Sequence, residues 1–487
     1  MRKIIVVGAG IAGLIAAIYA QRSGFEVVLL EQHSVAGGMC TSWRRKGYLF
    51  EGAVHWLTGS NPKTAIHQIW EETGALGSDI PVLYPDPFRS VECGGQTIYL
   101  YRDIDKTVEH LQEVSPRDAQ KLRQLAKEVK SLCSIQMPIT DIRGLKSETP
   151  RRASLGMLLR MLPALPTIVK LGKLSCKDIR ERFEHPGIRR VLSIVPDEYT
   201  ATSLLFTLAT LHTGDGGYPE GGSLTMVGRM VDTFKNLGGT LMLKTKAQRV
   251  LVEDGVATGV EIEGGRLDGD AVVVAQETMA ALDMLFDVPP KDEWLSELKS
   301  TTKPAVCTFI GVGIKTAIPQ VPEWQLDEPI TYAGQTVEEL GFNSYADYPG
   351  FAPEGGTALT TILMGDSYDF WKQARDSGNY QEEKQALADQ ISKAISKKFP
   401  HAQGNIEVID IATPLTYERY TGAYHGSWMS IITPGQKMAQ YSGEAKGVSG
   451  LYFTGHRLIA PGGLPVAALS GRQAAQQLCR HFDTVFR

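Results

Sequence analysis

The sequence predicts an α/β fold in which a parallel sheet is covered by helices and is assembled from segments far apart in the chain. Three observations lead to this expectation: an apolar run with spaced glycines at residues 4–20, a strand-rich block at 240–275, and a strand, a Gly/Pro turn and a helix from residue 450 onward. A length of 487 residues leaves room for two or three domains. We therefore expect a doubly wound domain that is interrupted by a second domain.

Composition and charge narrow the kind of protein. Hydrophobic residues make up 43% of the chain and charged residues 21%, as is usual for globular proteins that bury a core. The net charge of −4 gives no reason to expect nucleic acid as a partner. The cysteines show no CxxC or Cys/His spacing, so we expect no metal site, and reduced thiols in a cytoplasmic protein. They are Cys40, Cys93, Cys133, Cys176, Cys307 and Cys479.

The first 20 residues imitate a secretion signal but fit a folded start better. Arg2 and Lys3 precede an apolar run, as they would in a signal peptide. Gly8, Gly10 and Gly13 nevertheless fall where a strand, turn and helix require glycine. Elsewhere, charges or prolines interrupt the apolar stretches before they reach the ~20 residues that a membrane-spanning helix needs. We therefore expect that the protein is not an integral membrane protein.

The first half of the chain begins with a βαβ half-unit and then leaves it. The half-unit has strands at 3–7 and 26–30 around a helix at 11–23. The region that follows is mixed, with a helix at 63–75, strands around 89–101 and a helix at 105–133. Residues 151–212 are expected to be mainly helical and are interrupted by four prolines, namely Pro163, Pro166, Pro186 and Pro196.

The second half returns to strands. We interpret 240–244, 248–253, 256–262 and 271–275 as a β-meander that leads back to the first domain. Strands alternate with Pro/Gly loops at 304–365, and 381–398 is an amphipathic helix. A strand at 450–454 and a helix at 465–482 close the chain.

The glycine-rich turn after the first strand indicates a dinucleotide site. Gly8, Gly10 and Gly13 fit G-x-G-x-x-G, which allows a tight turn, a close pyrophosphate and close helix packing. The helix N-terminus adds free N–H groups and a positive dipole end. Glu31 lies 18 residues after Gly13, where a carboxylate accepts hydrogen bonds from ribose hydroxyls and disfavours the 2′-phosphate of NADP.

The residues after Glu31 resemble a known family. The spacing Glu31-x5-Gly37-Gly38 is similar to the extended FAD signature of the large group that contains amine oxidases and phytoene desaturases. In that group the second glycine pair lets the chain pass the pyrophosphate, and the segment that corresponds to 52–57 lies beside the isoalloxazine. Met39 stands where many relatives have a basic residue. The resemblance implies a noncovalently bound FAD.

The C-terminal part resembles the same family. Residues 450–456 and 461–465 are similar to the C-terminal FAD motif of phytoene desaturases, carotenoid isomerases and retinol saturases. Gly455 permits the backbone to approach the flavin chain, and Pro465 at a helix start directs a helix dipole at the site. Segments 218–223 and 413–422 also resemble the family, so the resemblance covers the whole chain.

The resemblance implies a Rossmann-type FAD-binding domain, like that of glutathione reductase and the amine oxidases, with an inserted mixed α+β substrate domain. We expect residues 1–90, 215–290 and 435–487 to form the FAD-binding domain. Residues 91–214 and 291–434 are expected to form the substrate-binding domain.

Motifs and resemblance together define the expected site residues. The resemblance places His55 beside the isoalloxazine and Val250 at the adenine end, and His55 and His456 are the candidate catalytic residues. The expected cofactor-binding residues are Gly8, Ala9, Gly10, Ile11, Ala12, Gly13, Glu31, Gln32, Gly37, Gly38, Met39, His55, Val250, Gly455, His456, Leu464, Pro465 and Val466.

The implied function is FAD-dependent oxidation or reduction of an apolar isoprenoid or polyene at C–C or C=C bonds, by desaturation, saturation or cis–trans isomerisation through hydride exchange with flavin N5. One alternative is an amine or amino-acid oxidase of the same superfamily, although residues 454–471 contain no aromatic side chain for the cage typical of amine oxidases. Another is a binding protein that retains a flavin or NAD without turnover. The substrate, the electron acceptor and the oligomeric state stay open.

Residues 149–177 combine basic and apolar side chains and contain no Asp or Glu. Such a segment suits the surface of an anionic bilayer, where apolar side chains enter the interface and Lys/Arg meet headgroups. It equally suits an internal helical hairpin broken at Pro163 and Pro166. The first alternative implies a cytoplasmic protein that is peripheral to a membrane, with 149–177 as its membrane-facing segment.

Overall fold

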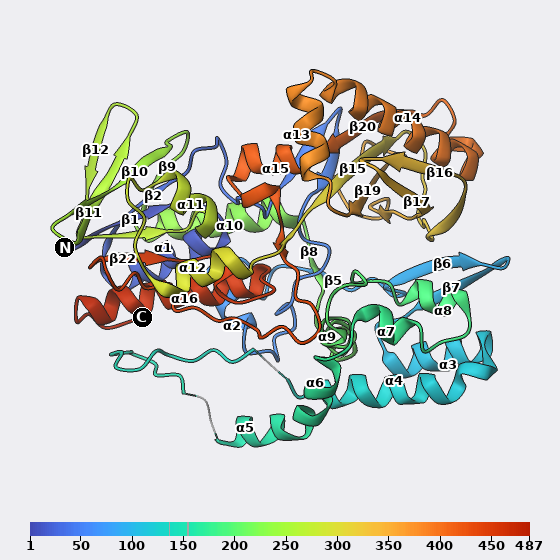
Figure 1. Ribbon diagram of the computed structural model, residues 1–487, viewed down its shortest axis with the longest axis horizontal. Helices are drawn as coiled ribbons and strands as arrows, with labels where there is room; N and C mark the ends of the chain where they lie inside the picture. Colours follow the sequence, from blue (N-terminus) through green and yellow to red (C-terminus); the bar gives the residue numbers. More distant parts are fainter. Residues whose placement is uncertain (136, 153–154) are drawn as a thin grey trace.

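A five-stranded parallel sheet organises the fold. The computed structural model describes residues 1–135, 137–152 and 155–487, and Figure 1 shows this sheet on the left. Its strand order is β22-β13-β1-β2-β9. The strands are β1 (Lys3–Val7), β2 (Glu26–Leu30), β9 (Thr240–Met242), β13 (Ala271–Val274) and β22 (Leu451–Phe453). The predicted α/β fold, assembled from distant segments, is therefore confirmed.

Alternate residues of these strands face two different cores. Ile4 and Val6 pack with α1 (Ile11–Arg22), α10 (Gly222–Asn236) and α16 (Leu464–His481). Ile5 and Val7 pack on the other face with the antiparallel strands β10 (Ala247–Glu253), β11 (Val256–Ile262) and β12 (Gly265–Asp268) and with α11 (Thr278–Met284). Both faces of the sheet are covered, which explains the continuous apolar run of each central strand.

The strand-rich block at 240–275 divides between two sheets. We expected one β-meander, but β9 and β13 join the parallel sheet, and only β10, β11 and β12 form an antiparallel meander. Continuous burial of β13 on both faces is the signal of a parallel strand, whereas β10 and β11 mix buried positions with partly or fully exposed ones.

Helix α1 approaches its neighbours at backbone distance. A Cβ atom on Gly13 would lie 1.9 Å from the Gly8 carbonyl oxygen, and one on Gly471 of α16 would lie 2.5 Å from the Ala12 carbonyl oxygen. Real Cβ atoms cannot come so close, so glycine is required at both positions. The contact holds α1 and α16 with both N-termini at the same edge of the sheet.

A second sheet lies at the upper right of Figure 1. It is antiparallel, in the order β18-β19-β15-β20, and a hairpin of β16 and β17 lies beside it. The bounds are β15 (Cys307–Ile314), β16 (Trp324–Tyr332), β17 (Gln335–Leu340), β18 (Asn343–Ser344), β19 (Thr357–Met364) and β20 (Ile406–Ala412). Helices α13 (Tyr368–Asp376), α14 (Tyr380–Lys398) and α15 (Pro414–Thr421) accompany it, and α14 confirms the amphipathic helix predicted at 381–398.

A mainly helical part extends from the centre of Figure 1 to its bottom and lower right. They are α3 (Ile104–Val114), α4 (Ala119–Leu132), α5 (Leu155–Met161), α6 (Leu165–Leu171), α7 (Cys176–Arg180), α8 (Pro186–Val191) and α9 (Ala201–His212), with the hairpin β6 (Arg89–Cys93) and β7 (Gln96–Leu100). The prediction of a single helix at 105–133 is wrong, because α3 and α4 are separate helices. Pro116 cannot continue α3, and Ser115 before it has non-helical backbone angles of φ −142° and ψ 88°.

Short elements connect these parts. They are β3 (Ser42–Arg45), β4 (Tyr48–Glu51), α2 (His67–Glu72), β5 (Val82–Leu83), β8 (Tyr218–Pro219), α12 (Glu293–Thr301), β14 (Pro304–Ala305) and β21 (Met429–Ser430). The core around α1 continues without a break into the second sheet through Phe309, Tyr345 and Phe351. The two parts therefore share one continuous core, and the domain boundaries expected above stay a prediction.

The glycine contact between α1 and α16 generates a stability prediction. Gly471→Ala should lower the free energy of unfolding by about 1–3 kcal/mol, because the added methyl group overpacks a backbone contact. Gly228→Ala in α10 is the matched control, since its added Cβ meets nothing within 4 Å. It should stabilise the protein by up to about 1 kcal/mol through helix propensity. Thermal unfolding of both variants measures the difference, and equal effects would contradict the contact.

Candidate functional site

One continuous cavity of about 2230 Å³ begins at the carboxyl ends of the parallel strands and extends between α9 and the second sheet. A single drug-sized ligand needs roughly 300–1,000 Å³, so this cavity has room for two ligands in contact. Ligands of open α/β sheets bind at the carboxyl edge of the strands. The cavity therefore lies where the sequence motifs place a site.

The turn from β1 to α1 forms the floor of this edge. Gly8 has φ +101°, a conformation that favours glycine, and its N–H donates to the Leu30 carbonyl at 2.8 Å. Gly8, Gly10, Ile11 and Ala12 line the cavity. Gly10 is the N-cap residue of α1, and it has no side chain that could bond to the N–H groups of the first turn. The free N–H groups of the first turn therefore suit an anionic group.

Glu31 at the end of β2 also lines the cavity, together with Gln32. Its carboxylate accepts hydrogen bonds from the Ala9 N–H at 3.0 Å and from the His33 N–H at 2.9 Å. The side chain is nearly buried, and this burial raises the pKa of the Glu31 carboxyl above its usual value. Ala9 thus orients the carboxylate from outside the cavity wall.

The Gly37-Gly38 pair lies directly against the first glycine turn. The Gly37 N–H donates to the Ala9 carbonyl at 2.8 Å, and a Cβ on Gly38 would lie 3.3 Å from the Gly10 Cα. Both glycines have positive φ. Because neither loop carries side chains here, the two backbones form one narrow cradle, and Met39 extends its wall.

His55 lines the same cavity as a neutral hydrogen-bond donor. The Asn343 side-chain amide donates to His55 Nδ1 at 3.2 Å, which leaves the ring proton on Nε2. His55 Nε2 is buried and has no hydrogen-bond partner among the described residues. Burial lowers the pKa of His55 to about 4, so the ring is uncharged at neutral pH.

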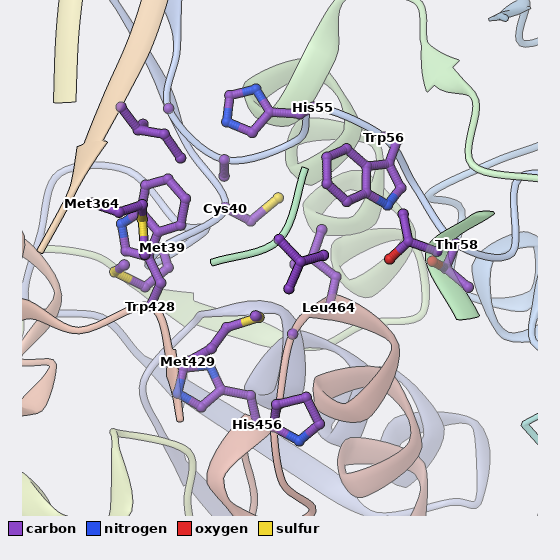
Figure 2. A pocket seen from close by; sticks show the side chains of 18 of the residues that line it. Met39, Cys40, His55, Trp56, Thr58, Met364, Trp428, Met429, His456 and Leu464 are labelled. Atoms are coloured by element: carbon purple, nitrogen blue, oxygen red, sulfur yellow. The ribbon is translucent and has the colours of Figure 1, made fainter. Parts of the chain in front are cut away.

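His456 presents a second unpartnered imidazole. Its Nε2 is buried without a partner in the part of the chain that the structure describes. Burial, and then the charge of Arg457, lowers the pKa of His456 to about 3. Figure 2 shows His55 and His456 on opposite sides of the pocket. Two buried nitrogens without partners indicate that a polar ligand belongs between them.

The N-terminus of α16 completes this side of the pocket. Leu464, Pro465 and Val466 line the cavity, and the N-cap Gly463 supplies no side-chain cap. Gly455 has φ +146° and faces open space, since a Cβ there would meet nothing within 4 Å. The N-termini of α1 and α16 therefore both direct unbonded N–H groups and positive dipole ends at one cavity.

Three expected site residues do not line the cavity. Gly13 serves the packing of α1, and Ala9 acts through Glu31. Val250 is buried in the core beneath the meander, and its N–H donates to the Leu285 carbonyl. Ala247 lines the cavity instead, because β10 starts there at the edge of the sheet. Three strand residues cover about 10 Å, which carries Val250 away from the edge.

Other wall residues were missed by the sequence reasoning. The loop after β13, residues 276–278, follows a parallel strand and could have been found by the same carboxyl-edge rule. Asn343 had no sequence signal. The apolar side chains of the inner chamber come from four distant elements or loops, and Figure 2 shows several of them: Met39, Met364, Trp428, Met429 and Leu464.

No group of three or more His, Cys, Asp or Glu side chains in the described residues could hold a metal ion. The six cysteines are free, as expected for reduced thiols. The cavity itself combines glycine-lined backbone cradles with an apolar chamber beside them.

Comparison with known proteins agrees with this geometry. The model of the family described as "Flavin containing amine oxidoreductase" matches residues 11–479. Prolycopene isomerase 1 of an Oncidium hybrid cultivar is 23% identical over 97% of this chain and 83% of the isomerase. Phytoene desaturase (lycopene-forming) of Pseudescherichia vulneris is 27% identical over 98% of both chains. Wild-type putrescine oxidase bound to putrescine has a TM-score of 0.62 at 15% identity, over 98% of both chains.

The low pKa of His55 generates a pH prediction. Its folded pKa of about 4 lies below the ordinary value of 6.5, so between these values the unfolded chain binds a proton that the folded chain does not. Stability contributed by neutral His55 is present above pH 6.5 and is lost as the pH falls toward 4. The unfolding temperature of His55→Gln should therefore decline less steeply over this window. His401→Gln, at an exposed position, should follow the native slope; equal slopes for all three proteins would contradict a neutral buried ring.

Proposed function

Since the chain belongs to the flavin containing amine oxidoreductase family and is an FAD-dependent oxidoreductase, we propose that it acts on carbon–carbon bonds of an apolar isoprenoid or polyene. The observation that carries this proposal is the single cavity in which a polar, glycine-lined cradle continues into an apolar chamber. The similarity to an isomerase and a desaturase whose names specify polyenes supports it.

The described residues fit a noncovalently bound FAD. We assign the pyrophosphate to the N-terminus of α1 and the ribose hydroxyls to Glu31, because these offer unbonded N–H groups and a carboxylate at the cavity wall. We assign the adenine end to Gln32 and Ala247. The flavin end is assigned to the side where His55, Gly455, His456 and the N-terminus of α16 converge, which accounts for the two unpartnered imidazole nitrogens. Met39 is assigned to the wall between the two ends.

Bound FAD supplies a hydride acceptor or donor. The protein's own part is to position the substrate and to exclude water. Met364, Trp428 and Met429 line the cavity and offer an adaptable apolar surface to a long chain. His55 stays neutral and is held by Asn343, so it can donate a hydrogen bond without placing a charge beside that chain. Desaturation, saturation and isomerisation all use this arrangement.

The amine-oxidase alternative has weaker support. The likeness to putrescine oxidase is a likeness of fold, at 15% identity. Residues 454–471 contain no Phe, Trp or Tyr, so this segment has no counterpart of the aromatic cage by which amine oxidases typically bind an amine cation. The alternative of a cofactor-retaining protein without turnover stays open to the same test.

An anaerobic titration tests the proposed function. The purified protein should release FAD on heating, and a conjugated or isoprenoid C20 to C40 compound should change the spectrum of the bound flavin. Rapid flavin reduction by simple amines, with no response to any polyene, would establish an amine oxidase instead. Bound FAD that responds to neither would leave only a binding role. Product mass separates the reactions: unchanged for an isomerase, two hydrogens lighter for a desaturase and two heavier for a saturase.

We further propose that the protein attaches peripherally to an anionic membrane through α5 and α6. Five large apolar side chains here are between 48% and 72% exposed, namely Leu155, Leu159, Leu162, Leu165 and Val169. Contiguous exposed apolar side chains indicate an interaction surface. No helix in residues 1–135, 137–152 and 155–487 has the length and hydropathy of a bilayer-spanning helix, so attachment would be interfacial.

The position of α6 links this surface to the cavity. Ile168 of α6, Gly172 after it and the nearby Ile135 and Met137 line the cavity wall, whereas Leu165 and Val169 of the same helix are exposed. Glu128 of α4 pairs with Lys170 at 2.8 Å and holds α6 in place. An apolar substrate could thus pass from the bilayer to the chamber along one helix. Figure 1 shows α5 projecting below the body of the molecule.

Vesicle co-sedimentation tests the attachment. Arg160 and Lys173 are the basic residues chosen for charge reversal, because they are exposed. Lys170 and Arg151 are unsuitable, since Lys170 forms a salt bridge with Glu128 and Arg151 forms one with Glu72. The double variant Arg160→Glu/Lys173→Glu should bind phosphatidylserine vesicles at least about tenfold more weakly, since each basic residue contributes about 1 kcal/mol.

The control reverses two exposed lysines elsewhere, Lys63→Glu/Lys235→Glu, and keeps the same net charge as the test variant. It should pellet like the native protein. Equal pelleting of the two variants, or no pelleting of the native protein, would assign the apolar side chains of α5 and α6 to another role.

A further inference from the structure

Four arginines line the cavity, and one of them differs from the rest. Three form salt bridges with carboxylates: Arg89 with Glu323, Arg180 with Asp197, and Arg457 with Glu277. Arg102 has no carboxylate partner within salt-bridge distance in the described part of the chain. It is therefore the arginine of the cavity wall whose charge is not directly neutralised.

Arg102 is held rigidly at the wall. Its Nη2 donates to the backbone carbonyls of Asp215 and Gly216, the latter at 3.1 Å. The guanidinium carbon lies 5.1 Å from the centre of the Tyr84 ring, a cation–π distance. Arg102 Nη1 is buried and has no hydrogen-bond partner among residues 1–135, 137–152 and 155–487. Two N–H groups on Nη1 are therefore fixed in position and unused.

The nearest acidic side chains are already engaged. Asp215 accepts hydrogen bonds from the Gly59 N–H at 2.8 Å, from the Ser60 hydroxyl and from the Asn61 N–H. The Asp86 carboxylate accepts from the Arg102 backbone N–H and forms a salt bridge with Lys106 at 3.1 Å. Burial lowers the pKa of Arg102, which means that its surroundings destabilise the charge. An anion placed at Nη1 would relieve this destabilisation.

Trp56 connects this arginine to the apolar chamber. A Cβ on Gly216 would lie 3.3 Å from Trp56 Cδ1 and 3.8 Å from Arg102 Nη2, so the indole and the guanidinium flank the same point of the backbone. Figure 2 shows Trp56 and Thr58 across the pocket from Met39, Met364 and Trp428. One end of the chamber therefore has a fixed cation, and the opposite wall is apolar.

We propose that Arg102 binds a terminal carboxylate of the substrate, so that the enzyme acts on an isoprenoid or polyene acid and not on a hydrocarbon. This inference rests on the proposed function, because it requires an apolar chain in the chamber. The planar guanidinium suits a carboxylate, which accepts hydrogen bonds at Nη1. Arg102 is then the residue that determines specificity for the end group and fixes which bonds of the chain lie at the flavin.

Matched ligands test this inference on the FAD-loaded enzyme. The probes are all-trans-retinoic acid, all-trans-retinol and the retinoid hydrocarbon with a methyl group in place of the carboxylate. Dissociation constants come from the change in flavin absorbance. The native enzyme should bind the acid about 10- to 100-fold more tightly than the hydrocarbon, as expected for hydrogen bonds to charged groups. The alcohol should fall between them.

Substitutions at Arg102 should remove this preference. Arg102→Gln should bind the acid and the hydrocarbon equally, with hydrocarbon affinity unchanged. Arg102→Lys keeps the charge and should keep part of the preference; it also serves if the glutamine variant fails to fold, which flavin content and the unfolding temperature report. Arg89→Gln, which removes an arginine that is already paired with Glu323, should leave the acid-to-hydrocarbon ratio at the native value.

The outcomes separate this inference from the proposed function. If the hydrocarbon perturbs the flavin and the acid binds no more tightly, or if neither Arg102 variant changes the ratio, the carboxylate site is refuted while polyene chemistry stands. If none of the three probes perturbs the flavin although another C20 to C40 compound does, the carboxylate site alone is refuted; if no isoprenoid or polyene does, both are refuted. An acid preference that disappears in Arg102→Gln and persists in Arg89→Gln supports the assignment.

Discussion

The backbone contact of α1 with the turn after β1 and with α16 is the constraint on which the rest of the molecule depends. Gly13 and Gly471 allow approaches that no other residue permits. Because both helices start at the carboxyl edge of the sheet, this contact aims two positive helix ends at one space. A dinucleotide carries its negative charge and its polar ring edge at two separated points, and the paired helices provide for both.

The cavity is shaped by two parts of the protein that share one core. Residues packed against α1 continue into Phe309 of the second sheet and Tyr345 directly after β18, so the chamber and the cradle are joined by one core. His55 follows β4, Asn343 begins β18 of the second sheet, and their side chains are hydrogen-bonded in the cavity wall. Burial keeps the ring uncharged, and three of the four arginines of the walls are paired with carboxylates, whereas Arg102 has no carboxylate partner in the described part of the chain. This arrangement agrees with the proposed long apolar substrate that carries a polar end.

Much of the cradle could be predicted from the sequence, because local geometry requires particular residues there. A tight turn with positive φ, a close backbone approach and a carboxylate at a strand end occur within the first forty residues, and each depends on neighbours in the chain. The strands at 3–7 and 26–30 are found with the predicted bounds for the same reason. The helix break at Pro116 was also within reach, since a proline excludes the continuation.

The sequence by itself determined the fold class, the glycine cradle and the acidic residue beside it. Only the tertiary structure decided that Ala247 and not Val250 reaches the cavity, that Asn343 orients His55, and that Arg102 stands unpaired at the wall among the described residues. The physical reason is the distance along the chain between interacting residues. Backbone conformation is set by residues a few positions apart, whereas partners such as Asn343 and His55 are 288 positions apart and meet only after every intervening element has packed.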